Sequence, residues 1–271
     1  MTEPVIRPIE AGDLPGLRRL WLEAFGDPEP MIDAFYRLLP EMGSGLCAAA
    51  GAEVVGFSHL ITGLALERPG QKRENAGYLY AVAVDPAWRD RGLGGALSRA
   101  GFALGKAQGL KLLCLQPADE GLFAWYDKRL GTGCALRRRK ELLPAGEAQP
   151  CMALSPTDFR FWREQLLRGR PHLVLGDGAL RYQHSLLRCF GGGFYLIGDA
   201  VAAVDRDGDT LRIPELLCAR PEERPALAAA LAASLGASRA LLCTADPAGE
   251  PYLTALPDCL PADTVWDLSF D

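Results

Sequence analysis

The sequence predicts a mixed α/β fold, with a mostly antiparallel sheet flanked by helices and a second, degenerate copy of the same arrangement. Strand-like and helix-like segments alternate as β–α–α–β–β–β–α–β–α–β in the first half, which is a layered α/β pattern. The hairpin, strand, helix and strand recur about 130 residues later, a spacing that indicates domain duplication rather than a solenoid. Chance similarity of two α/β segments is the alternative.

A short strand and two helices open the chain. The segment that begins "VIRPIE" predicts the strand. Asp13 suits the N-cap of the first helix and Pro15 its first turn. A second helix is expected over about Pro30–Leu39. The apolar stripe of the first helix consists of Leu14, Leu17, Trp21 and Ala24.

The central segments predict the sheet and its covering helices. A hairpin turns at Gly51-Ala52-Glu53, where β-branched residues follow a polar turn. Gly77–Val84 predicts a buried strand, Gly94–Gln108 a helix and Leu110–Pro117 another strand. The segment "GLFAWYDKRLG" predicts a short helix with Gly131 at its C-cap, and "CALRRRKELL" a final strand.

The proline, glycine and alanine content of Leu142–Pro150 predicts a linker. The first domain is therefore expected to span residues 1–148 and the second residues 149–271. In the second, "SRALLCTADPAGE" shares the Leu-Leu-Cys core of "LKLLCLQPADEG" and the turn that follows it.

Composition narrows the function classes. The net charge of −5 argues against a nucleic-acid partner, which would need a basic surface. The N-terminus lacks the pattern of a signal peptide, and Ala226–Leu235 is too short to cross a bilayer. We therefore expect a cytoplasmic protein with no membrane partner. The eight cysteines include no C-x-x-C pair and form no metal-binding pattern with the histidines, so reduced structural thiols and no metal are expected.

Two interpretations compete for "DPAWRDRGLGGAL", Asp85–Leu97, where glycines stand at the start of a predicted helix. A dinucleotide fingerprint would need glycine where Leu97 stands, and the preceding hairpin is not the opening of a βαβ unit. An anion cradle fits better. Glycine lets a phosphate approach the unpaired amides of a helix start, and Arg89 and Arg91 add positive charge. A merely close-packed helix start is the alternative.

The motif Arg89-x-x-Gly92-x-Gly94-Gly95-Ala96 resembles that of the GNAT family of N-acetyltransferases. The later family motif, an aromatic residue and a tyrosine before a Lys-x-x-Gly ending, matches at Phe123, Tyr126, Lys128 and Gly131. The resemblance covers about residues 4–142 and implies the acyl-CoA N-acyltransferase fold. The tandem layout is also similar to the enhanced intracellular survival class, whose third domain has no room in this chain.

The resemblance implies acetyl-CoA as co-substrate, a primary amine of a small molecule or peptide as acceptor, and direct attack in a ternary complex. Tyr126 would protonate the leaving thiolate, and no metal is implied. A regulatory protein that binds acyl-CoA without turnover is the alternative function. The implied cofactor-binding residues are Val82, Ala83 and Val84, whose backbone would pair with the pantetheine arm, and Arg89, Asp90, Arg91, Gly92, Leu93, Gly94, Gly95 and Ala96 of the cradle.

The sequence leaves the general base open among His59, Glu120, Tyr78 and Tyr80. The basic run Arg137-Arg138-Arg139-Lys140 is interpreted as a solvated edge strand. The acceptor is not identified, and a homo-oligomer stays open.

The second copy is expected to hold no cofactor. Glu222 and Glu223 would repel a pyrophosphate at its helix start, and Pro221 and Pro225 lack backbone N–H donors. This copy would form a wall of the acceptor pocket or an oligomer surface, and the C-terminal carboxylate of Asp271 is a candidate to reach the active site.

Overall fold

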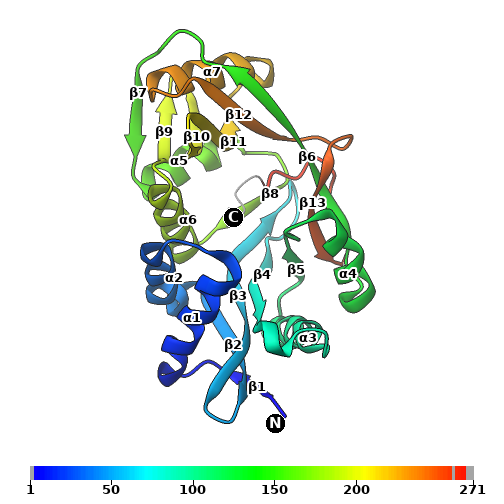
Figure 1. The fold of residues 1–271 in the computed structure, drawn as a ribbon. Helices are drawn as coiled ribbons and strands as arrows, with labels where there is room; N and C mark the ends of the chain where they lie inside the picture. The colour runs from blue at the N-terminus through cyan, green and yellow to red at the C-terminus, as the bar shows by residue number, and fades with distance from the viewer. Residues whose placement is uncertain (1–2, 258–259, 267–271) are drawn as a thin grey trace.

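One continuous sheet runs through the whole molecule (Figure 1). The computed structural model describes residues 3–257 and 260–266. Over these residues the sheet has 13 strands, ordered β1-β2-β3-β4-β5-β13-β6-β12-β11-β10-β9-β7, and β8 pairs with β3 beside this path. The first-half strands are β1 (Val5–Pro8), β2 (Gly43–Ala50), β3 (Glu53–Glu67), β4 (Glu74–Val84), β5 (Leu112–Leu115) and β6 (Gly133–Pro144).

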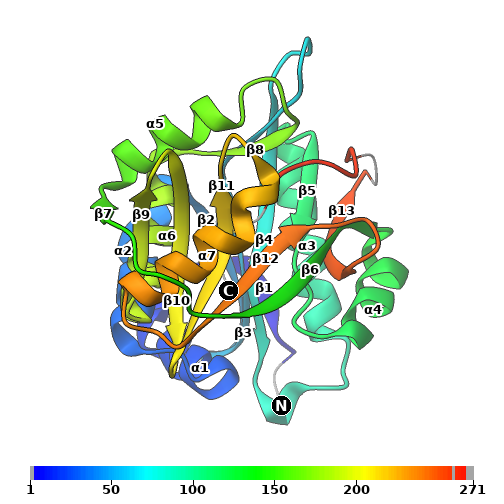
Figure 2. The same cartoon turned by 90° about the horizontal axis from the view of Figure 1, so that it is seen from above.

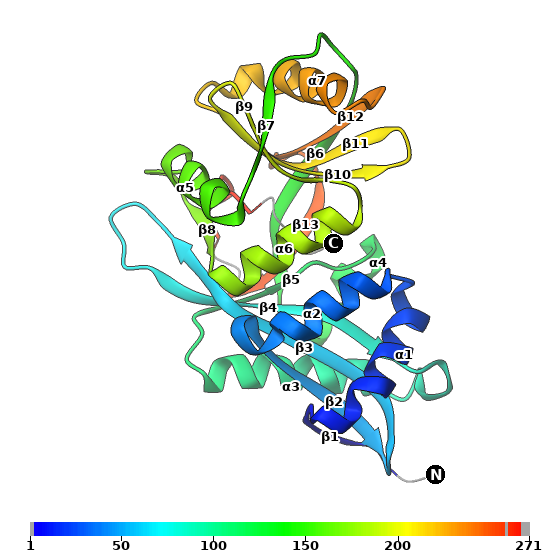
Figure 3. The ribbon, with the colours of Figure 1, turned by 90° about the vertical axis from the view of Figure 1, so that its left-hand side faces the viewer.

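Helices cover both faces of the first-half sheet (Figure 3). One face packs against α1 (Leu14–Phe25) and α2 (Glu29–Met42), the other against α3 (Leu93–Ala107). The short helix α4 (Glu120–Leu130) lies beside α3. Side chains alternate along β3 as a strand requires: Phe57 and Ile61 join the cluster under α1, and Leu60 joins the cluster under α3.

The expected hairpin is present, with its turn between β2 and β3, and Gly131 ends α4 in a left-handed conformation at φ 69°. Asp13 does precede α1, but its carboxylate makes no cap hydrogen bond there. It accepts instead from the Arg7 guanidinium at 2.7 and 2.9 Å and from the Glu10 N–H at 2.8 Å. The helix therefore begins where Asp13 predicted, but the Asp13 carboxylate binds Arg7 and Glu10 and does not cap the helix.

The second half repeats most of the element order of the first, with β8 inserted between its first two helices and no described helix in the place of α4. The matching pairs of parallel strands, β4–β5 and β11–β12, each enclose a helix, α3 or α7. Figure 2 shows α7 lying over this second part of the sheet, where it contacts β11 and β12. The mixed, mostly antiparallel fold with a second copy is thus confirmed. The elements are β7 (Cys151–Leu154), α5 (Pro156–Leu166), β8 (His172–Leu175), α6 (Asp177–Cys189), β9 (Gly193–Ile197), β10 (Ala200–Asp207), β11 (Thr210–Leu217), α7 (Arg224–Ser234), β12 (Arg239–Ala245) and β13 (Glu250–Leu256).

The two halves exchange their last strands. β13, from the C-terminal half, lies between β5 and β6 and pairs antiparallel with both. The beginning of β6 pairs with β13, and its end, from Arg138 to Pro144, pairs with β12. The sheet pairing therefore crosses the division expected at residue 148, which stays a prediction.

The interpretation of the basic run 137–140 as an edge strand is wrong, because β6 has a neighbour on each side. The local sequence pattern could not predict that β13 and β12 flank β6, since both strands lie about a hundred residues later in the chain. The four basic side chains contact the segment that links these strands or the first residues of β13. Arg137 donates to the Gly249 carbonyl, Arg138 lies over the Tyr252 ring, Arg139 pairs with Asp246, and Lys140 pairs with Glu250.

Two further contacts join the halves on the α1–α2 side. α6 packs against α2, where Arg181 forms an ion pair with Glu41, and the Tyr182 hydroxyl lies 3.0 Å from that of Tyr80. β8 pairs antiparallel with the far end of β3, from Leu64 to Glu67. Among the helices of the described residues, none has both the length and the apolar character that crossing a bilayer requires.

Candidate active site

The sheet opens between β4 and β5. These parallel strands pair only from Ala76–Leu112 to Tyr78–Cys114, and within the described strands β4 continues to Val84 without pairing with β5. A register shift between β3 and β4 and a positive φ of 48° at Ala81 accompany the divergence. Backbone groups on the β5 side of the strand end are thereby freed from sheet pairing. Val82, Ala83 and Val84, the predicted pantetheine partners, lie on this stretch.

The loop after β4 is held by its own side chains. The Asp85 carboxylate accepts from the Ala87 N–H at 3.0 Å, and the Arg89 Nε donates to the Val84 carbonyl at 3.1 Å. The Arg91 guanidinium lies 5.1 Å from the centre of the Trp88 ring. Arg89 therefore anchors the loop to the end of β4, while Arg91 packs on its aromatic neighbour.

The start of α3 leaves its first amides outside the helical hydrogen-bond pattern. Asp90 and Gly92 have left-handed conformations, with φ of 61° and 77°, and α3 begins at Leu93. The Ala96 N–H bonds to the Gly92 carbonyl at 3.0 Å. The N–H groups of residues 93–95 come before that bond and point out of the helix start, where the helix dipole favours an anion.

The glycines have different surroundings. A β-carbon at Gly92 would contact nothing within 4 Å, but the positive φ itself favours glycine. At Gly94 it would lie 3.7 Å from Val84 Cγ2 and 3.9 Å from the Trp125 ring, at ordinary contact distances. Gly94 therefore sits between the end of β4 and α4, with room around it.

Two arginines that the sequence analysis did not single out adjoin the same helix start. A β-carbon at Gly95 would lie 3.2 Å from Arg129 Cδ and 3.3 Å from Arg99 Nη1. Arg129 lies over the Trp125 ring, 4.0 Å from its centre. Arg99 follows Gly95 by one helical turn, a spacing that the sequence could have revealed. The positive charge at this helix start is thus larger than Arg89 and Arg91 alone supply.

Tyr126 lies on the inward side of α4, packed against the apolar cluster that contains Leu79, Phe102 and Leu115. Burial raises the pKa of its phenol to about 12, although a hydrogen bond with the Ser98 hydroxyl lowers this pKa in part. Ser98 in turn donates to the Gly94 carbonyl at 2.8 Å. Tyr126 is therefore neutral at physiological pH and adjoins the same turn of α3 that carries the cradle.

The four candidates for the general base lie in different settings. His59 is 1% exposed among aromatic rings, and burial lowers its pKa to about 3, so it is neutral and a poor proton acceptor at neutral pH. Tyr78 and Tyr80 are buried in the same core. Glu120 is exposed and lines a cavity of about 350 Å³ at the start of α4. Phe123, Arg138 and Tyr252 also line this cavity.

The corresponding helix start in the second half has other chemistry. A 3-10 turn at Pro221–Glu223 leads into α7, with Pro225 in its first turn. Glu222 and Glu223 lie in the turn, and Arg220 pairs with Glu223 at 2.6 Å. The segment lacks glycine, so no close approach to its backbone is provided there.

Residues 5–129 match the family described as the acetyltransferase (GNAT) domain. The chain carries a GNAT acetyltransferase domain. The match includes the end of β4, the cradle, α3 and most of α4, so the candidate site lies wholly within the GNAT domain. Among curated proteins, none matches this chain.

Solved structures share the fold over nearly the whole chain, beyond the GNAT domain itself. A conserved protein of unknown function from Enterococcus faecalis is 12% identical, with a TM-score of 0.72 over 94% of this chain and 72% of that one. A GCN5-related N-acetyltransferase from Kribbella flavida is 16% identical, with a TM-score of 0.68 over 93% and 71%. Eis1 from Mycobacterium abscessus is 16% identical, with a TM-score of 0.63 over 92% and 72%. At these identities the likeness concerns the fold, second copy included.

Proposed function

We propose that this protein is an acetyl-CoA-dependent N-acetyltransferase that acts on a primary amine of a small molecule or peptide. One observation carries the proposal. The glycine-lined amides at the start of α3 adjoin both the free end of β4 and the α4 helix that carries Tyr126. An anion-binding helix start and a neutral phenol thus lie beside an open strand edge, which is what binding an acyl-CoA and releasing its thiol require.

Each part of the site has a distinct role in binding. The β4 backbone at Val82–Val84 would pair with the amides of the pantetheine arm. The N–H groups of residues 91–95 would bind the pyrophosphate, with charge from Arg91, Arg99 and Arg129. Arg89 would keep the loop attached to the end of β4.

Tyr126 would assist departure of the thiolate after the acceptor amine attacks the thioester carbonyl carbon. The C–N bond would form and the C–S bond would break, a base would take the proton that the amine nitrogen loses, and the phenol O–H would donate a hydrogen bond to the sulfur that carries the released electron pair. Because a thiolate is a weaker base than a phenolate of raised pKa, donation of a hydrogen bond contributes more here than full proton transfer.

We propose the division into a catalytic domain, residues 1–148, and a second domain, residues 149–271, without a cofactor site. Pro221, Pro225 and the two glutamates before α7 support the latter part. Titration of the intact protein with acetyl-CoA in a calorimeter should give one site per chain. Two equivalent sites would contradict the proposal.

Asp271 lies outside the described residues, and its role and a cytoplasmic location stay predictions.

The acceptor is tested with a panel of amines. Thiol release from acetyl-CoA would be followed with primary amines, with matched tertiary amines and with peptides that carry a free N-terminal amine. We expect release with primary amines only, together with an acetylated product detectable by mass spectrometry. Tight binding of acetyl-CoA with no release for any amine would favour the regulatory acyl-CoA-binding function instead.

A further inference from the structure

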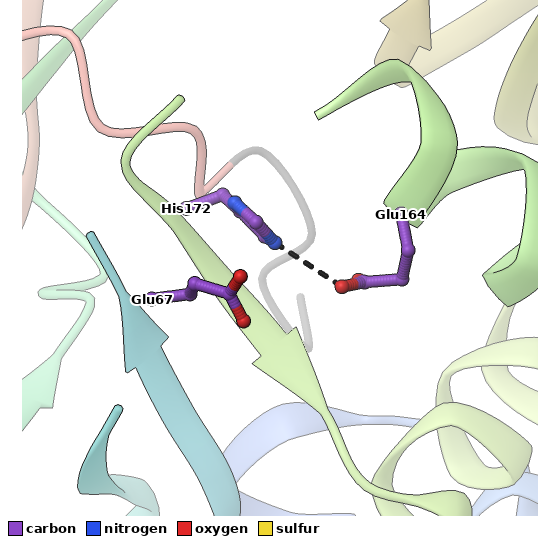
Figure 4. A group of neighbouring side chains, drawn as sticks. All are labelled: Glu67, Glu164 and His172. Carbon is purple, nitrogen blue, oxygen red and sulfur yellow. Dashed lines mark hydrogen bonds and ion pairs between the residues drawn. The ribbon is translucent and has the colours of Figure 1, made fainter. Parts of the chain in front are cut away.

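Three ligand-type side chains converge where the first half meets the second, away from the candidate active site. Glu67 ends β3 and His172 begins β8, and these two residues are direct partners across the antiparallel pair. Glu164 reaches them from α5. One ligand atom from each of the three lies within 4.8 Å of the others, and Figure 4 shows their side chains directed toward one another.

The ring of His172 is fixed in one orientation. It is 2% exposed, and its Nδ1 lies 2.8 Å from the Arg170 carbonyl. A carbonyl oxygen only accepts, so Nδ1 carries a hydrogen and donates it. In the neutral ring Nε2 is then a bare lone pair, and it lies 3.2 Å from Glu164 Oε2, which is also a lone pair. A cation between these atoms, either a proton or a metal ion, resolves the clash of like lone pairs.

Arginines orient the two carboxylates. Arg73 donates to Glu67 Oε2, through its Nε at 3.0 Å and also through Nη2, and Arg163 Nη1 donates to Glu164 Oε1 at 3.3 Å. Arg163 is itself buried and bound to both oxygens of Glu215. The Glu164 carboxylate is therefore held by Arg163 through Oε1, while its Oε2 faces His172.

This pattern is that of a metal-binding shell. A histidine that ligates through one nitrogen usually donates the other N–H to a backbone carbonyl or carboxylate, and ligating carboxylates are in turn hydrogen-bonded. His172 and the two glutamates meet both conditions. One imidazole nitrogen and two carboxylate oxygens are the donor set that suits Zn²⁺, with a water completing four-coordination.

We propose that Glu67, Glu164 and His172 bind one divalent transition-metal ion of the Zn²⁺ class. The ion would tie the end of β3, in the GNAT domain, to β8 and α5 of the second half. Its role is structural, since the site shares no residue with the cradle or Tyr126. Spacing along the sequence does not indicate this group, because the β3–β8 pairing and the packing of α5 bring its three residues together.

Calorimetry on the full-length, chelator-treated protein tests the proposal with Zn²⁺ as the probe. We expect one ion per chain. Glu67→Gln and His172→Gln should each weaken binding by more than the roughly 10- to 100-fold that loss of a second-shell partner costs. Glu41→Gln is the matched control, because it removes one exposed carboxylate that pairs with an arginine at the same junction. It should bind Zn²⁺ as the natural protein does.

Two results would overturn the proposal. One is absence of Zn²⁺ binding to the natural protein, which would leave a proton as the cation between His172 and Glu164. The other is binding that the Glu67→Gln variant retains in full, which would place the ion elsewhere. If His172→Gln does not fold, anomalous diffraction from zinc-soaked crystals of the natural protein decides, since a peak must lie between the three side chains.

Discussion

The Ser98 hydroxyl donates a 2.8 Å hydrogen bond to the Gly94 carbonyl, and the same hydroxyl interacts with the Tyr126 phenol and lowers its pKa. Residues of two separate family motifs, on α3 and α4, therefore meet through one side chain. This relationship places the residue proposed to assist thiol release beside the turn proposed to bind the pyrophosphate.

Gly94→Val should abolish or strongly weaken binding of coenzyme A while the fold is kept. A β-carbon at Gly94 makes only ordinary contacts with Val84 and Trp125, so the added bulk would occupy the proposed ligand space. Gly92→Val is a poorer probe, because its φ of 77° strains any other residue. Calorimetry with coenzyme A measures the effect. Gly12→Val, at an open site on the surface of the chain, is the control, and equal affinity in the two variants would refute the cradle.

Tyr126→Phe should lower turnover by about 10²–10³-fold, the usual effect of losing one transition-state donor, and leave the affinity for acetyl-CoA unchanged. Only the hydroxyl is removed, and the ring keeps its packing against the α3 face of the sheet. Steady-state kinetics at saturating donor would measure it. Tyr195→Phe, a control variant on β9, should have the same turnover as the natural protein. Full activity of Tyr126→Phe would make Tyr126 a packing residue.

The pH profile of turnover should show no loss from Tyr126 as pH rises from about 8 to 10. The active form is the neutral phenol, and burial raises its pKa from 10.0 to about 12, so it stays protonated over this range. Profiles of the natural protein and Tyr126→Phe should therefore have the same shape and differ only in height. A basic limb near pH 10 that disappears in the variant would show that the phenol titrates normally.

Leu253→Ala should destabilise the protein by about 2–5 kcal/mol, because Leu253 is fully buried in β13 and leaves a cavity. We expect a single cooperative thermal transition at a lower temperature, since β13 pairs with strands of the first half. Calorimetric melting measures this. Two separate transitions, with only one of them shifted, would show that the halves unfold independently.

Local pattern predicted most of the elements. The 2- and 3.6-residue periods, the glycine turn at residues 51–53 and the C-cap at Gly131 all depend on neighbours in sequence, and these agree with the structure. The start of α3 was predictable for the same reason, because its chemistry lies in one short segment.

Features that depend on long-range pairing were not predictable. Arg138 looked solvated because nothing in its own strand shows that Tyr252 would lie against it. Arg129 and Gly95 are brought together by the packing of α3 and α4. His172 meets Glu67 only through the β3–β8 register. Each of these contacts joins segments whose separation removes any local signal.

The position of β13 also has a consequence for synthesis. A chain is made from its N-terminus, and domains usually fold as they leave the ribosome. Here the gap between β5 and β6 cannot be filled until residues 250–256 have emerged, long after both neighbouring strands have been made. Until then the nascent chain exposes two unpaired strand edges beside a GNAT domain that is otherwise complete, a state open to mispairing with other chains. We expect expression to depend more on chaperone supply during translation than the stability of the finished protein would suggest.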